Sequence, residues 1–184
     1  LLSNSDIGHR IKARLLALPP RAFELFTGDL LEFMGLRDVS VTRYTGDGGI
    51  DAVGRLETSA ALISIPTGVQ VKRHRANVQR ADIDRFIGAL SGQYPHGIFI
   101  TTAGYARGAA HKAANVMPRI ATVDGDQVAA LMLRHQLGIA GVAGGLDEEY
   151  FAQFEETAAA GLQRVAERPA AYHTGRAEDG RAVH

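Results

Sequence analysis

The stretch that decides the fold runs from Val69 to Thr102 and reads VQVKRHRANVQRADIDRFIGALSGQYPHGIFITT. It opens at 69–72 with alternating residues typical of a β-strand, and it closes at 97–102 with a short apolar run typical of a buried strand. Between them, over 78–90, apolar residues recur at helical spacing. A strand, a helix and a second strand in succession predict a sheet that is covered by helices.

Before this stretch, the apolar spacing predicts helices over 5–18 and 20–34, separated by Pro19-Pro20 and followed by Gly35. Alternating or apolar segments then predict short strands at 39–42 and 50–53, and one or two further strands over 61–65 and 69–72. Pro66 interrupts the last two, and a proline within a strand implies an edge, a bulge or a turn.

After this stretch, strands and helices continue to alternate. The sequence predicts a helix at 106–116, a strand at 120–123, a helix capped by Asp124 and ending at 134, a Gly/Ala-rich linker at 137–145 and a last helix at 147–167. The whole pattern predicts an α/β fold in which a mixed sheet carries helices on both faces.

The composition excludes several classes of protein. Of the 184 residues, 46% are hydrophobic and 22% are charged, which is the balance of a globular domain. The chain has no cysteine, so a disulfide scaffold, a thiolate nucleophile and a cysteine zinc site are ruled out, and its seven histidines show no metal-ligand spacing. No apolar run approaches the roughly 18 residues that cross a bilayer, and no signal peptide is visible, so we expect a cytoplasmic protein.

Residues able to do chemistry concentrate in two short strings, GDGGID at 46–51 and QVK at 70–72. On a strand, Gln70 and Lys72 point to the same face, and Asp51 can meet them from a neighbouring strand. A carboxylate and an amide oxygen are hard ligands that suit Mg²⁺. A nearby ammonium group stabilises the charge that develops on a phosphate. The three side chains therefore suffice for metal-assisted phosphodiester hydrolysis.

The same residues also have an ordinary interpretation. Glycine-rich turns with aspartate are common in hairpins, and Asp47 fits that role better than metal binding. A Gln and a Lys that alternate on a strand usually belong to a solvated face. The glycines are not a phosphate-binding P-loop, because no Gly-Lys-Ser/Thr follows them. The residues alone leave both interpretations open.

Five strings in order resemble the catalytic domain of Mrr-type restriction endonucleases, a branch of the PD-(D/E)XK nuclease superfamily in which Gln replaces the usual acidic residue. They are Phe23-Glu24, Gly46–Asp51, Gln70–Arg73, Gly97–Thr102 and Val123–Gly125. The similarity covers about two-thirds of the chain. It implies a restriction-endonuclease-like fold and Mg²⁺-dependent cleavage of double-stranded DNA, with Mn²⁺ as a substitute, by a type II or type IV enzyme that restricts foreign or modified DNA.

Carried over residue by residue, the resemblance makes Asp51 the metal-binding carboxylate, Gln70 the second ligand and Lys72 the lysine of the motif. Glu24 corresponds to an acidic residue on the first core helix that supplements the metal site in related nucleases. Because Gln70 is neutral, the site has one negative charge fewer, and we expect modest metal affinity unless Glu24 compensates.

The basic residues next to this site, Arg73, Arg75 and Arg80, are predicted to bind DNA phosphates, and their alternative role is a solvated surface. Thr101 and Thr102 end a strand, where they either contact a phosphate or cap the strand. The twenty Lys and Arg balance the twenty Asp and Glu, so a polyanion must be bound by locally gathered cations.

The resemblance also suggests a division of the chain. We expect a helical lead-in from an upstream domain at 1–18, a nuclease domain at 19–138, a linker and helix at 139–168 and a disordered tail at 169–184. Because the chain starts with Leu1, we expect a longer protein with a recognition domain outside it.

Cleavage of both strands favours a homodimer or higher oligomer. The aromatic residues of the last helix, Tyr150, Phe151 and Phe154, together with Leu162, would either form that interface or pack on their own domain. Two other functions stay open: a non-catalytic DNA-binding or assembly module that keeps the nuclease fold, and a resolvase or repair nuclease for branched DNA.

Overall fold

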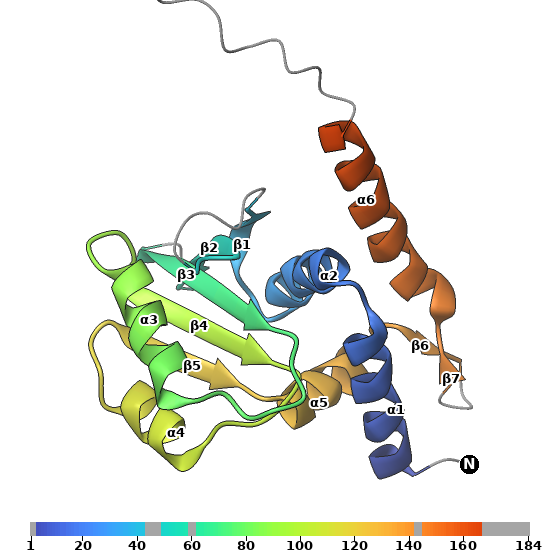
Figure 1. The fold of residues 1–184 in the computed structure, drawn as a ribbon, viewed down its shortest axis with the longest axis horizontal. Helices are drawn as coiled ribbons and strands as arrows, with labels where there is room; N and C mark the ends of the chain where they lie inside the picture. Colours follow the sequence, from blue (N-terminus) through green and yellow to red (C-terminus); the bar gives the residue numbers. More distant parts are fainter. Residues whose placement is uncertain (1–2, 43–48, 59–61, 142–144, 167–184) are drawn as a thin grey trace, which may run out of the picture.

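The computed structural model describes residues 3–42, 49–58, 62–141 and 145–166 of the 184-residue chain (Figure 1). Most of the predicted turn at 46–49 and the predicted disordered tail at 169–184 lie outside the described residues. Within the described residues, no helix is both long and apolar enough to span a bilayer.

A five-stranded mixed sheet forms the centre of the molecule, in the order β1-β2-β3-β4-β5. Its strands are β1 (Arg37–Val41), β2 (Ala52–Glu57), β3 (Ser64–Lys72), β4 (His96–Thr101) and β5 (Arg119–Val123). The first three strands pair antiparallel, and β3, β4 and β5 pair parallel. The parallel half arises because helices connect those strands, as the alternation in the sequence predicts. The predicted mixed α/β sheet is confirmed.

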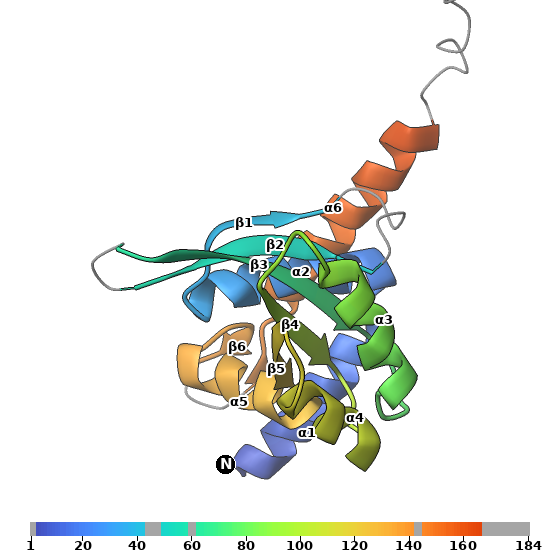
Figure 2. The same ribbon diagram turned by 90° about the vertical axis from the view of Figure 1, so that its left-hand side faces the viewer.

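Helices cover both faces of this sheet (Figures 1 and 2). One face carries α1 (Asn4–Ala17), α2 (Pro20–Phe33), α5 (Gly125–His135) and α6 (Glu148–Ala166), and the other carries α3 (Arg80–Leu90) and α4 (Arg107–Ala114). Each layer buries its own hydrophobic cluster against the sheet. Polar residues on a strand therefore face one of two separate cores.

Strand β3 is a single continuous strand, which is one of the two possibilities that the sequence left open around Pro66. Its pairing with β2 runs in unbroken register from Ser64 to Val69, and its pairing with β4 begins only at Thr67. Pro66 thus lies where the β4 side of the strand is open, so its missing N–H costs no hydrogen bond with β4. Of the three roles that a proline within a strand implies, the local edge position is the one that Pro66 has.

Two glycines bring α3 directly onto the sheet. A Cβ atom at Gly68 would lie 2.7 Å from Leu90, and one at Gly97 would lie 2.5 Å from Leu90 and 2.9 Å from Phe86. Because side chains alternate along a strand, Gln70 and Lys72 point to the same face as Gly68. The close approach of α3 therefore fixes the environment of both residues.

Helices α1 and α6 belong to the same hydrophobic cluster as α2, through Ile11, Leu15, Phe151 and others. Arg14 of α1 joins the two helices: its guanidinium donates to Glu148 and Glu155 of α6. The predicted linker at 137–145 contains a small hairpin, β6 (Ile139–Ala140) and β7 (Gly145–Leu146). Both helices are thus integral to the described fold.

Candidate active site

Asp51 lies immediately before β2, where that strand separates from β3. Its carboxylate Oδ2 accepts a hydrogen bond of 2.8 Å from the backbone N–H of Val71, and its own N–H donates to the carbonyl of Val69. Pairing of β2 with β3 ends at Ala52 and Val69, so the side chain of Asp51 takes the place that a further β2 residue would occupy. The chain thereby fixes this carboxylate against the backbone of β3 on both sides of Gln70 in the sequence.

Gln70 carries a buried polar atom that the fold leaves unused. Its Oε1 is inaccessible to solvent and has no hydrogen-bond partner among the described residues. Gly49, at φ +110°, lies against the same amide, because a Cβ there would be 2.9 Å from Nε2 of Gln70. An orphaned buried acceptor costs about 1–3 kcal/mol and therefore calls for a donor or a cation.

Glu24 of α2 is close enough to Asp51 for its charge to act on that carboxyl group. Its carboxylate, with a side chain 17% exposed, pairs with Arg21 at 2.7 Å, and the same Nη1 of Arg21 donates to the carbonyl of Thr42. Burial raises the pKa of Asp51, the negative charge of Glu24 raises it further, and the Val71 N–H and the charge of Arg21 partly offset both effects. The carboxylates of Glu24 and Asp51 therefore repel each other electrostatically.

Lys72 has a carboxylate partner that the sequence analysis did not single out. Its Nζ lies 2.9 Å from Oδ2 of Asp82, which is 8% exposed near the start of α3. Asp82 also accepts from the backbone N–H of Gln79 and pairs with Arg85. Burial acts to raise the pKa of Asp82, but the hydrogen bonds from Lys72 and Gln79 outweigh it and lower that pKa. The ion pair therefore holds Lys72 in one orientation.

These residues fit a divalent cation through carboxylate and amide oxygens. Within the described part of the chain, no group of three or more His, Asp or Glu side chains gathers as a ready metal site. A cation here would need the orphaned Oε1 of Gln70 next to Asp51, with Glu24 within electrostatic reach. Oxygen ligands of this kind suit Mg²⁺, which tolerates few protein ligands and keeps its waters.

Three of the residues predicted to bind DNA have internal partners. Arg73 donates to the carbonyl of Leu16 at 2.7 Å, which ties β3 to the end of α1. Thr101 and Thr102 are buried, and their hydroxyls donate to the carbonyls of Lys72 and His74. These contacts hold the end of β3 in place, which is the capping alternative for the two threonines. Their contact with DNA stays a prediction.

Arg75 and Arg80 are exposed, as a phosphate-binding role requires. Arg80 opens α3, two residues before Asp82, and its Nε lies 3.6 Å from Asp84. Sequence reasoning missed Asp82 and Arg21. Asp82 lies ten residues after Lys72 on another element, and that spacing gives no sequence signal for a contact. For Arg21, the one available signal is its i,i+3 spacing from Glu24 on α2.

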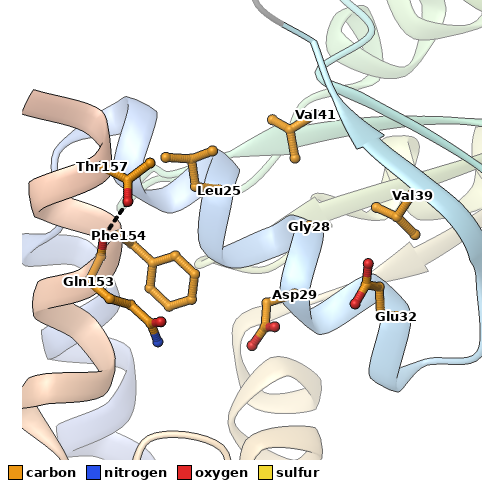
Figure 3. Close-up of a pocket in the computed structure, with 9 residues that line it drawn as sticks. All are labelled: Leu25, Gly28, Asp29, Glu32, Val39, Val41, Gln153, Phe154 and Thr157. Atoms are coloured by element: carbon orange, nitrogen blue, oxygen red, sulfur yellow. Dashed lines mark hydrogen bonds between the residues drawn. The ribbon is translucent and has the colours of Figure 1, made fainter. Parts of the chain in front are cut away.

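A hollow on the opposite face, between α2, β1 and α6, is separate from this site (Figure 3). It has a volume of about 300 Å³, with an apolar floor that includes Leu25 and Phe154. Asp29 and Glu32 line it, and Asp29 accepts a 2.6 Å hydrogen bond from the hydroxyl of Tyr150. Two carboxylates make this hollow a poor site for a phosphate.

The three aromatic residues of α6 named in the sequence analysis pack on the domain itself. Phe151 is fully buried, Phe154 is 9% exposed, and Tyr150 is bonded to Asp29. The alternative in which these three side chains pack on their own domain is therefore the correct one. The side chain of Leu162 lies outside the described residues, and an oligomer stays a prediction.

Comparison with known proteins adds independent findings. Residues 15–132 match the family Mrr_cat, described as Restriction endonuclease. The chain is 33% identical, over 138 residues, to the type IV methyl-directed restriction enzyme EcoKMrr of Escherichia coli (strain K12). That alignment covers 72% of this chain and 44% of the relative.

Two solved structures share the fold. The DNA modification-dependent restriction endonuclease AspBHI matches with a TM-score of 0.61 and 20% identity, over 85% of this chain and 40% of that chain. The MspJI restriction endonuclease in complex with a 27-mer oligonucleotide matches with the same TM-score and identity, over 85% and 38%. The chain thus spans less than half the length of each of these three proteins.

Proposed function

Because this chain belongs to the Mrr_cat family of restriction endonucleases, we propose that it hydrolyses the phosphodiester backbone of double-stranded DNA with Asp51, Gln70 and Lys72. Glu24 assists from α2. The observation that carries the proposal is the orphaned Oε1 of Gln70 on the strand whose next residue, Val71, binds the carboxylate of Asp51 through its backbone N–H. A solvated strand face would leave Gln70 in water, whereas this amide oxygen is buried and meets no donor among the described residues.

The acceptor set supports a divalent cation, with Mg²⁺ as the first choice and Mn²⁺ as a substitute. Asp51, Gln70 and Glu24 would hold it. When bound, such an ion stabilises negative charge on phosphate oxygens and makes a water more acidic. Its affinity should be modest, because Gln70 is neutral and Arg21 already neutralises part of the charge of Glu24.

Lys72 would stabilise the charge that builds up on the phosphate during hydrolysis. Its pairing with Asp82 at 2.9 Å keeps the ammonium group in one orientation before DNA arrives, and a pre-oriented charge needs no reorganisation at the moment of reaction. Asp82 is thus a positioning residue for Lys72. Arg75 and Arg80 would bind neighbouring phosphates, and two chains would cut the two strands.

The substrate we propose is modified DNA. The relative is named as a methyl-directed enzyme and one structural neighbour as a modification-dependent one. This chain spans 44% of that relative and 40% of that structural neighbour, and we propose that recognition of the modified base belongs to another part of a longer protein. The resulting activity would be restriction of foreign DNA.

Cleavage of supercoiled plasmid tests this function. The wild-type chain should nick or linearise plasmid with Mg²⁺ and not with EDTA, and Asp51→Asn and Lys72→Ala should each lose activity by about 100-fold or more. Methylated and unmethylated plasmids, cut in parallel by the longer protein that includes the recognition part, test the substrate. Arg10→Ala, an exposed change on α1, is the control. Cleavage by either variant at the wild-type rate would contradict the assignment of the site.

A further inference from the structure

A second hollow lies on the α3 side of the sheet, between the start of α3 and one face of α4. It has a volume of about 520 Å³ and is lined only by cationic, polar and glycine residues: Arg80, Arg107, Gly108, His111, Lys112 and Asn115. Gly108 leaves its wall open, since the nearest atom to a Cβ there would be Cβ of Arg80 at 3.9 Å. Among the described residues, none that lines the hollow carries a carboxylate.

The charges around this hollow do not cancel. Arg80 and Lys112 share one carboxylate, Asp84, at 3.6 and 3.4 Å, which are long distances for ion pairs. Arg107 makes no ion pair with any described residue and is exposed. Three permanent cations thus face one anion, in a molecule whose formal net charge is zero. Arginine and lysine donors in a concave site are suited to a phosphate.

The fold places this hollow beside the candidate active site. Parallel β3 and β4 end at the same edge of the sheet, β3 leads into α3, and β4 leads into α4. The two connections are joined by hydrogen bonds from the N–H of Val78 to the carbonyl of Gly104 and from the N–H of Ala106 to the carbonyl of Val78, both 2.9 Å. Helix α3 then presents Asp82 to Lys72 and Arg80 to the hollow.

We propose that this hollow binds a backbone phosphate of the DNA duplex at a position away from the bond that is cut. The proposal rests on the proposed function and extends its DNA contacts to α4, through Arg107 and Lys112. The hollow is open to solvent, since the side chain of Arg80 is 67% exposed. A phosphate that is part of a long DNA backbone can therefore reach it, so we favour DNA over a small free anion. The contact would fix the register of the duplex against Lys72 without reading its sequence.

Duplex binding as a function of salt tests the site without any cleavage. The 184-residue chain in EDTA is titrated into a fluorescent duplex, and the slope of log K against log salt is measured for the wild type, Arg107→Ala and Arg10→Ala. Loss of one phosphate contact should lower the slope by about 0.9 and weaken binding several-fold at moderate salt. Arg10→Ala removes an equally exposed arginine from α1 and should leave the slope unchanged.

Three results would overturn the proposal: no duplex binding by the wild type, an unchanged slope in Arg107→Ala, or an equal loss in Arg10→Ala. Inorganic phosphate separates a free anion from DNA as the source of the phosphate. Saturable binding of inorganic phosphate that Arg107→Ala abolishes, with duplex binding unaffected, would assign the hollow to a free anion. A changed slope together with absent cleavage in Mg²⁺ would support the hollow and reject the proposed nuclease.

Discussion

Asp51 is the residue whose environment says most about function. Its carboxylate is largely buried, it lies near a second carboxylate, and one backbone N–H and one arginine only partly compensate. Its pKa is raised, so the folded chain binds a proton there more tightly than the unfolded chain does. Ionisation of Asp51 near neutral pH therefore opposes folding. This is what we expect of a carboxylate whose charge would be balanced only when a cation binds.

We predict that Asp51→Asn stabilises the chain at pH 7 while it abolishes cleavage. Asparagine keeps an acceptor for the Val71 N–H and does not ionise, so the gain should grow as pH rises from about 4 and reach about 1 kcal/mol. Urea unfolding at pH 4 and pH 7 measures it. Asp126→Asn, at a side chain 82% exposed, is the control and should not stabilise. Equal stability of wild type and Asp51→Asn at pH 7 would contradict the prediction.

We also predict that Gln70→Glu converts the site into a stronger cation site. A second carboxylate beside Asp51 adds about 1–2 kcal/mol of attraction for a divalent ion, or roughly tenfold in affinity. Without metal, the same change should lower the melting temperature, because like charges are buried together. Thermal melts with and without Mg²⁺ or Ca²⁺ give both effects. Gln93→Glu, at an exposed position, should change neither, and a metal response equal to that of wild type would rule out Gln70 as a ligand.

At the scale of elements, α3 connects folding with chemistry. Asp82 closes the capping box of this helix by accepting from the N–H of Gln79, and the same carboxylate holds Lys72 of β3. Its lowered pKa means that this stabilisation is present above the ordinary pKa of aspartate and is lost as pH falls through the folded value. The start of α3 and the orientation of Lys72 are therefore set by one side chain.

Asp82→Asn should lower the rate of cleavage about 10- to 100-fold and destabilise the chain by about 1 kcal/mol. The effect should fall on kcat and leave the affinity for DNA in EDTA unchanged, because Lys72 stays present but is less well oriented. Asp82→Glu should restore part of the rate. Asp84→Asn, on the same helix but facing Arg80 and Lys112, should not alter kcat. An equal loss of kcat in both variants would argue for a general effect on α3.

Arg14 has the corresponding role between α1 and α6. Its guanidinium donates to Glu148 and to both oxygens of Glu155, and it lies 5.0 Å from the centre of the Phe151 ring. We predict that Arg14→Ala lowers the free energy of unfolding by about 2 kcal/mol, since the hydrogen bonds, the ring contact and the packing of the side chain are lost together. Chemical unfolding measures it. Arg10→Ala is the matched control, and an equal effect of both would contradict the prediction.

At the scale of the whole molecule, the candidate site draws residues from both helical layers and from the sheet between them. This arrangement explains which of its residues could be predicted from the sequence. Strand periodicity put Gln70 and Lys72 on one face, and chain order put Asp51 beside them. The partner of Lys72 could not be predicted, because Asp82 reaches it only once α3 lies flat on Gly68 and Gly97. Pro66 suggested a break, since the sequence does not say where β4 begins to pair.

The basic residues illustrate the same limit. Arg73 and Arg75 are alike in the sequence, yet Arg73 turns to the carbonyl of Leu16 in the distant α1, and Arg75 is exposed. Nothing in the sequence distinguishes Arg107 and Lys112 from other surface residues. Only the packing of α3 against α4 brings them around one hollow with Arg80. Local pattern predicts which face a residue takes, whereas its partner depends on how separate elements dock.

The unsatisfied amide oxygen of Gln70 has a consequence for the lifetime of the protein. An ion that fills the position removes a fault in the middle of the sheet, so the loaded chain should open less often than the bare one. In the absence of divalent ions, a protease should therefore digest the protein faster than in their presence. A shortage of divalent ions would then limit both the activity proposed for this chain and the number of its molecules.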